Sequence, residues 1–216
     1  MVRPPAERTT RGRARGGVTC VSNVSVKQPI ETRADEILDV VVELLEEGGY
    51  DAVTVRAVAS RARVSLATIY TLFGSRDELV IQAMERWLAA HVGAEVGRPA
   101  PDEPVEEWLV RTALAAFDPW QRSPVMLRAM LRAQVGPGGE RLARAGVAVY
   151  EPLLGEVLVG LEPGFVEDLG TILEYVLFAA FTRFAAGEIT VDDVAGVLAR
   201  TLFRLFAAGP GGRRGR

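Results

Sequence analysis

Two short runs of apolar residues at helical spacing, separated by a sharp break, most constrain the fold of this chain. Residues 53 to 73 read V-T-V-R-A-V-A-S-R-A-R-V-S-L-A-T-I-Y-T-L-F. The first run places apolar residues at i, i+3, i+4 and i+7: Val55, Val58, Ala59 and Ala62. This spacing predicts a short helix with one buried face. Thr54 stands at its expected N-cap position.

A second short helix is expected after a break at Val64, with Ser65 as its N-cap. Its expected inward positions are Leu66, Ile69, Leu72 and Phe73. Two short helices joined by a tight turn form a helix-turn-helix. The outer side then carries small or hydroxyl-bearing residues: Ala67, Thr68, Tyr70 and Thr71. Such a face can enter the major groove of DNA without repelling phosphate. An ordinary helical hairpin in a core is the alternative interpretation.

The residues needed for common catalytic and metal sites are scarce in this sequence. His91 is the single histidine and Cys20 the single cysteine, so a His-based metal site, a Cys cluster and an internal disulfide are excluded, and we identify no nucleophile with a histidine partner for a catalytic triad. The sequence contains no G-x-G-x-x-G, P-loop or H-E-x-x-H motif. We therefore expect no enzyme, no cofactor and no metal ion.

The charge is distributed unevenly along the chain. The formal net charge is −3, yet residues 1 to 30 carry six basic residues against one acidic residue, and residues 209 to 216 add three arginines. DNA binding would therefore come from a local face and depend steeply on salt. We expect 1–30 to be a disordered basic arm and 209–216 a disordered tail. The arm is either an idle extension or a minor-groove contact.

The polarity of the sequence predicts a soluble, cytoplasmic protein with no membrane partner. No apolar run reaches the length of a membrane span. No continuous apolar core follows the basic start, as a signal peptide would require.

Flanking helices complete an all-α fold. One helix is expected to begin at Thr32, which two acidic residues follow closely, and to end at Gly48 and Gly49. Another is expected to begin after Ser75, which forms a capping box with Glu78, and to run to about His91. A proline-rich break at 97–104 divides a DNA-binding domain, 31–92, from a ligand-binding and dimerisation domain, 105–208. In the second domain we expect helices over 105–117, 119–135, 141–159, 163–187 and 191–208.

The helices of the second domain carry large apolar residues that either line a pocket for an apolar ligand or form plain core. The candidate ligand-binding residues are Trp108, Phe117, Trp120, Met126, Met130, Tyr150, Tyr175 and Phe178. The last two helices are too apolar for a monomer to cover easily, so we expect them to pair with a second copy. The expected dimer interface comprises Ile172, Val176, Ala180, Phe184, Leu198, Leu202 and Leu205.

The helix-turn-helix resembles that of the TetR family of one-component transcriptional repressors. The matching residues are Thr54, Val58, Ala59, Ala62, Val64, Ser65, Thr68, Ile69, Tyr70 and Phe73, and Ser75 to Leu79 resembles the opening of the family's fourth helix. Arg63 replaces a frequent Gly, Asn or Asp, so a turn with positive φ would strain it by about 1 kcal/mol. Ala67 replaces a frequent Gly.

The resemblance implies which residues touch DNA. Thr54, Ser65, Tyr70 and Arg76 would position phosphates, and Leu66, Ala67, Thr68 and Thr71 would lie nearest the bases. Arg33 and Arg56 complete the expected DNA-contact set. The run from Gly48 to Ala59 is similar to that of actinobacterial regulators of lipid and sterol catabolism.

The sequence thus predicts a ligand-responsive repressor. Its partners would be palindromic double-stranded operator DNA, a second copy in a homodimer, and a small apolar effector that releases the DNA. A helical protein-interaction adaptor without specific DNA binding is the alternative.

Overall fold

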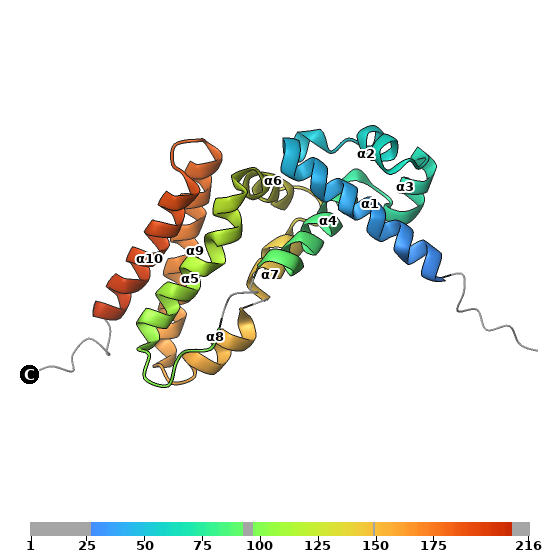
Figure 1. Cartoon of the computed structure of the whole chain (residues 1–216). Coiled ribbons are helices and arrows are strands. Elements are labelled where there is room, and N and C mark those ends of the chain that lie inside the picture. Colours follow the sequence, from blue (N-terminus) through green and yellow to red (C-terminus); the bar gives the residue numbers. More distant parts are fainter. Residues whose placement is uncertain (1–26, 93–96, 149, 209–216) are drawn as a thin grey trace, which may run out of the picture.

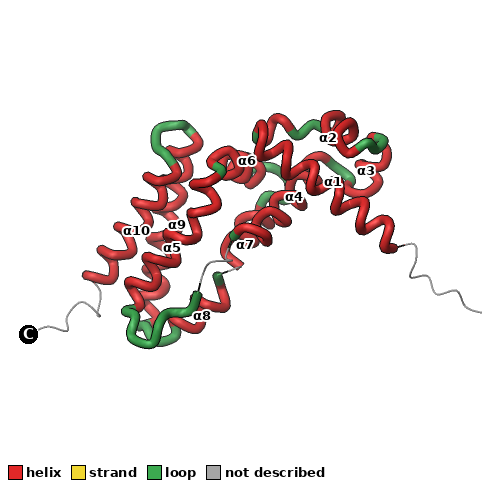
Figure 2. The backbone as a smooth tube through the Cα atoms, in the orientation of Figure 1, coloured by secondary structure: helices red, strands yellow, loops and turns green. Residues whose placement is uncertain are grey.

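The computed structural model of the chain describes residues 27–92, 97–148 and 150–208, and in these residues every regular element is a helix (Figures 1 and 2). The expected all-α class is confirmed. The predictions for residues 1–26 and 209–216 lie outside the described residues. The division into domains at 31–92 and 105–208 stays a prediction.

The N-terminal half contains α1 (Lys27–Gly48), the 3-10 helix η1 (Tyr50–Ala52), α2 (Val55–Ala62), α3 (Leu66–Phe73) and α4 (Arg76–His91). The predicted stop of α1 is confirmed, since Gly49 follows it with φ 70°. Its predicted start was wrong, because α1 begins at Lys27 and takes in Thr32. Pro29 falls in the first turn, where its missing N–H removes no helical hydrogen bond.

The C-terminal half contains α5 (Val105–Arg122), α6 (Pro124–Gln134), α7 (Glu140–Ala148), α8 (Glu151–Leu158), α9 (Pro163–Ala185) and α10 (Val191–Ala208). Two predicted boundaries were wrong. Pro119 lies inside α5, and the chain breaks at Ser123 because the residue before Pro124 avoids the α region. The predicted helix over 141–159 is divided, with Pro152 in the first turn of α8.

Two groups of helices lie at opposite ends of the molecule, with α6 and α7 between them (Figure 1). At one end α10 packs against α5 and α9, and at the other α1 packs against α2 and α4. Helix α6 contacts α1 and η1, and α7 contacts α4. The two connecting helices therefore join the body to the helix-turn-helix end.

Candidate DNA-binding site

The two caps of the helix-turn-helix form as predicted. The backbone N–H of Ala57 donates to Thr54 Oγ1 over 3.1 Å, at the start of α2. The N–H of Thr68 donates to Ser65 Oγ over 3.1 Å, at the start of α3. Because each hydroxyl satisfies an amide that the helix itself cannot, both helices begin at defined residues.

The turn between α2 and α3 places a left-handed residue at Arg63, the condition under which the sequence predicts strain. Arg63 has φ 54° and ψ 46°, and its N–H donates to the carbonyl oxygens of Ala59 and Ser60. A side chain in this region strains the backbone by about 1 kcal/mol. The turn leads from α2 into α3, and the surrounding hydrogen bonds hold Arg63 in this strained conformation.

One face of α3 is buried and the other is open to solvent. Ile69 and Phe73 pack into the core, while Tyr70 is 52% exposed and Ala67 and Thr71 are also exposed. The hydroxyl of Thr71 donates to the Ala67 carbonyl over 2.8 Å within α3. The outer face therefore presents methyl and phenol groups with no carboxylate among them.

Leu66 was expected to face both inward and toward the bases, and the inward assignment was wrong. Its side chain is 43% exposed. Side chains in a helix lean toward the N-terminus, so a residue at the first position of α3 projects beyond the packed part of the helix. Leu66 thus joins the outer face.

Arg76, an expected phosphate contact, is occupied elsewhere. Its Nε donates to the Val53 carbonyl over 2.5 Å and its Nη2 to the Tyr50 carbonyl over 2.7 Å. The guanidinium also stacks 4.2 Å above the Tyr50 ring. These contacts hold η1 against α4, so we remove Arg76 from the DNA-contact set. The two carbonyl groups that Arg76 binds lie 23 and 26 residues away along the chain, so a local sequence pattern could not predict these hydrogen bonds.

The remaining predicted arginines differ in their partners. Arg33 faces Glu36 across 3.4 Å within α1. Arg56, in the first turn of α2, is exposed and makes no ion pair or hydrogen bond among the residues that the structure describes. Its charge is therefore available to a phosphate group.

Helix α4 is fastened to the body by Arg141 of α7, a contact that sequence reasoning missed. Nε and Nη2 of Arg141 donate to the two carboxylate oxygens of Glu85 over 3.0 and 2.6 Å, and Nη1 donates to Glu78 over 2.8 Å. Glu78 thus pairs with Arg141, while the Ser75 N–H, which a capping box would assign to Glu78, donates to the Phe73 carbonyl.

Arg141→Gln is expected to lower the free energy of unfolding by about 1 kcal/mol at pH 7, because the pairs are charge-assisted but about a third exposed. Arg141, and then Gln82, hold the pKa of Glu78 below its ordinary 4.5. A lowered folded-state pKa stabilises the protein above pH 4.5, and the stabilisation is lost as pH falls through the folded value. Urea denaturation should therefore show a difference between the proteins at pH 7 that shrinks in acid. A constant difference down to pH 3 would contradict this assignment.

The predicted ligand-binding residues divide into two groups. Trp108 and Met126 are fully buried, and Phe117, Trp120 and Met130 are nearly so. Tyr175 and Phe178 are instead 70% and 73% exposed on the outer side of α9, so placing them with the others was wrong. Helix α9 is apolar over most of its circumference, and periodicity alone could not tell its inner side from its outer side.

Much of the predicted dimer interface is buried within the chain itself. Ala180 and Phe184 of α9 and Leu198 and Leu202 of α10 are at most 6% exposed. They pack where α10 meets α5 and α9, so they cannot meet a second copy. Ile172 is exposed at 37%, and Val176 and Leu205 are half-buried. The outer face of α9 is centred on Tyr175 and Phe178.

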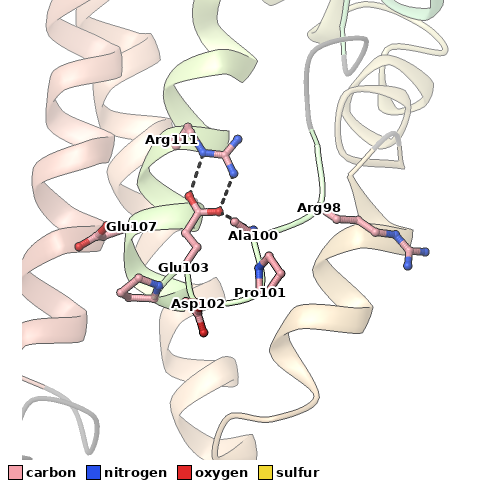
Figure 3. A pocket seen from close by; sticks show the side chains of 8 residues that line it. Arg98, Ala100, Pro101, Asp102, Glu103, Glu107 and Arg111 are labelled. Carbon is pink, nitrogen blue, oxygen red and sulfur yellow. Dashed lines mark hydrogen bonds and ion pairs between the residues drawn. The ribbon is translucent and has the colours of Figure 1, made fainter.

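A depression at the start of α5 is lined by charged side chains, and Glu103 and Arg111 are paired with each other within it (Figure 3). Glu103 accepts from Arg111 Nε and Nη2 over 2.9 and 2.8 Å and from the Ala100 N–H over 3.0 Å. Arg98 points away from them and pairs with Glu156 over 2.9 Å. This lining does not suit an apolar effector.

Comparisons with known proteins agree with this geometry. Residues 37–83 match the family described as bacterial regulatory proteins, tetR family, and residues 102–205 match the tetracyclin repressor-like C-terminal domain. An HTH-type transcriptional regulator of Mycobacterium bovis is 49% identical over 166 residues, covering 76% of this chain and 71% of that one. The HTH-type transcriptional repressor KstR of Rhodococcus jostii is 28% identical over 188 residues, covering 84% and 85%.

The fold is shared with solved structures. A TetR transcriptional regulator from Rhodococcus sp. RHA1 has a TM-score of 0.62 and 19% identity, over 82% of this chain and 97% of that chain. A tetR-family regulator from Streptomyces coelicolor has a TM-score of 0.59 and 19% identity, over 82% and 81%. The helix-turn-helix and the helical body define a DNA-binding transcriptional regulator. The chain belongs to the TetR family. No helix in the described ranges combines the length and apolar character needed to cross a membrane.

Proposed function

We propose that the protein is a repressor that binds palindromic operator DNA as a homodimer and releases it when a small apolar molecule binds its body. The outer face of α3 carries the proposal, because it is exposed and free of carboxylates around Tyr70. Phenol, hydroxyl and methyl groups can approach phosphates and thymine methyls alike. The proposed DNA contacts are Thr54, Arg56, Ser65, Leu66, Ala67, Thr68, Tyr70 and Thr71, with Arg33 at the edge.

A second copy would supply the other half of the site. One short helix reads only a few base pairs, whereas two helices related by a two-fold axis read half-sites about 34 Å apart. The aromatic side chains of Tyr175 and Phe178 stand out into solvent on α9. Exposed aromatic groups on one helix face favour a self-complementary contact. We therefore centre the dimer interface on this face of α9.

Ligand binding would act on DNA through α4. Arg141 holds α7 to α4, and Arg132 of α6 pairs with Asp51 of η1 over 3.2 Å. A shift of α6 and α7 around a ligand would thus move the helix-turn-helix. The ligand must bind the DNA-releasing conformation more tightly than the DNA-binding conformation, since only a difference in affinity shifts the equilibrium between the two.

Two buried hydroxyl groups indicate the chemistry of the effector. Thr112 Oγ1 of α5 and the hydroxyl of Tyr150, the residue before α8, have no hydrogen-bond partner among the described residues. Burial raises the pKa of Tyr150 to about 12, so the phenol remains a neutral donor. An apolar molecule with a carbonyl or hydroxyl group would bury its apolar part against the core and could satisfy one of these donors.

Tyr150→Phe is expected to raise the free energy of unfolding of the free protein by about 1 kcal/mol, because a buried unpaired hydroxyl carries a desolvation penalty. Urea denaturation at pH 7 measures the change. Tyr70→Phe removes the hydroxyl of a tyrosine that is 52% exposed and lies outside the proposed dimer interface, so in the absence of DNA it should leave stability unchanged and is the matched control. Destabilisation by Tyr150→Phe would mean that the phenol already has a partner in the free protein.

The function itself is tested by DNase I footprinting of the full chain on the DNA upstream of its own gene. The proposal predicts two protected half-sites related by a two-fold axis, at a stoichiometry of two protomers or a multiple. A helical adaptor would give no discrete footprint on this or any other stretch of its genome.

A further inference from the structure

The positive charge of the helix-turn-helix is concentrated at two arginines. From Ala52 to Arg76 the sequence contains four arginines and no Asp or Glu, although the whole chain has 28 acidic residues. Arg76 turns inward to backbone carbonyls, as described above. Arg61 reaches back to α1, where it pairs with Glu43 over 3.2 Å and with Glu47 over 2.6 Å.

Arg63 and Arg56 keep their charges free. Both are exposed, and neither makes an ion pair or hydrogen bond through its side chain to any residue that the structure describes. Arg56 lies in the first turn of α2, and Arg63 caps the C-terminal end of the helix in the left-handed conformation. Arg61, between them in the sequence, pairs with α1 instead. The charge of Arg61 is thus neutralised within the chain, and the charges of Arg56 and Arg63 are not.

The backbone conformation of Arg63 is one that glycine adopts more easily. A strained arginine whose side chain makes no ion pair or hydrogen bond to the described residues points to a partner outside the chain. A guanidinium group in the turn before a recognition helix is suited to a phosphate, because its planar donors match phosphate oxygens.

We propose that Arg63 binds a phosphate of the DNA backbone and, with Arg56, fixes how α3 enters the major groove. This inference rests on the proposed function and adds to it a contact that sequence reasoning did not assign. Arg63 is a positioning residue and does not read bases, so its contribution should be nearly the same on different DNA sequences.

The test is the salt dependence of DNA binding by the full chain, measured by fluorescence anisotropy between 50 and 200 mM NaCl. Two duplexes are used, the DNA upstream of the gene and an unrelated duplex of equal length. Arg63→Gly removes the charge and suits the turn. Arg61→Gln removes a charge only two residues away and is the matched control. Arg63→Lys keeps the charge.

Each phosphate contact adds about 0.9 to the magnitude of the slope of log affinity against log salt, and a dimer carries two copies of Arg63. Arg63→Gly should therefore reduce the magnitude of that slope by about 1.8. The ratio of wild-type to variant affinity should then be about tenfold larger at 50 than at 200 mM. Arg61→Gln should leave the slope unchanged, Arg63→Lys should restore it, and the melting temperature of Arg63→Gly should not fall.

The inference is overturned if Arg63→Gly keeps the wild-type slope, or if Arg61→Gln reduces the slope equally, since a general charge effect would then suffice. Failure of the proposed function looks different. In that case the wild-type protein binds both duplexes with equal affinity, and the slopes on either duplex still decide the role of Arg63.

Discussion

Tyr70→Ala is expected to weaken binding to the operator about a hundredfold. Tyr70 is the largest exposed side chain on the outer face of α3. Losing a central tyrosine contact weakens binding by about 1.5 kcal/mol, and a two-fold dimer loses it twice. Because Tyr70 is 52% exposed and contributes little to the core, helicity and dimerisation should not change. Anisotropy titrations, circular dichroism and light scattering measure the three quantities.

Tyr70→Phe separates the two ways in which this residue can act. If the phenol hydroxyl donates to a phosphate, Tyr70→Phe should lose most of the affinity that Tyr70→Ala loses. If the ring packs against sugars or thymine methyls, the phenylalanine variant should bind almost normally. Unchanged operator binding by Tyr70→Ala would show that α3 is not the recognition helix.

Phe178→Glu is expected to raise the dimer dissociation constant about a thousandfold or more. Phe178 is 73% exposed at the centre of the outer face of α9. Burying a phenylalanine contributes about 1.5 to 3 kcal/mol, the symmetric interface contains it twice, and the two glutamates would bring unpaired charge into that interface. Analytical ultracentrifugation measures the dissociation constant.

Val135→Glu is the matched control for Phe178→Glu. Val135 is 87% exposed between α6 and α7, away from α9, so its replacement should leave the dimer intact. The monomer produced by Phe178→Glu should keep its helices but bind operator DNA weakly, because one α3 reads only a half-site. A Phe178→Glu protein that remained dimeric would place the interface elsewhere.

The helix-turn-helix was predictable because its signals are local. Thr54 and Ser65 cap the helices that follow them, and Arg63 occupies the left-handed turn that its place in the motif required. Each of these features depends on hydrogen bonds between residues a few positions apart. The apolar spacing of α2 likewise identified Val58 and Ala59 as its buried residues. Local pattern and local geometry agree at these residues, whereas Leu66, predicted to face inward, is exposed.

The body was less predictable because its faces are decided by distant partners. Phe184 is buried and Phe178 is exposed on the same helix, although both are phenylalanines within an apolar run. Only the packing of α10 against α5 and α9 distinguishes them. The contact between Arg141 and Glu78 spans 63 residues, and no repeat or spacing in the sequence indicates it. The buried hydroxyls of Thr112 and Tyr150, which have no hydrogen-bond partner among the described residues, likewise depend on packing that no local pattern indicates.

The most direct test of the account is a titration of the purified protein onto fluorescent DNA from upstream of its own gene, against excess random duplex. The account predicts a tight complex that survives the competitor, saturates at two protomers or a multiple per site, and weakens steeply with salt. Native mass spectrometry of the same sample should find no bound ligand. Binding by ligand-free protein that random duplex fully displaces, on this DNA and across its genome, would contradict the claim that the protein is an operator-binding repressor.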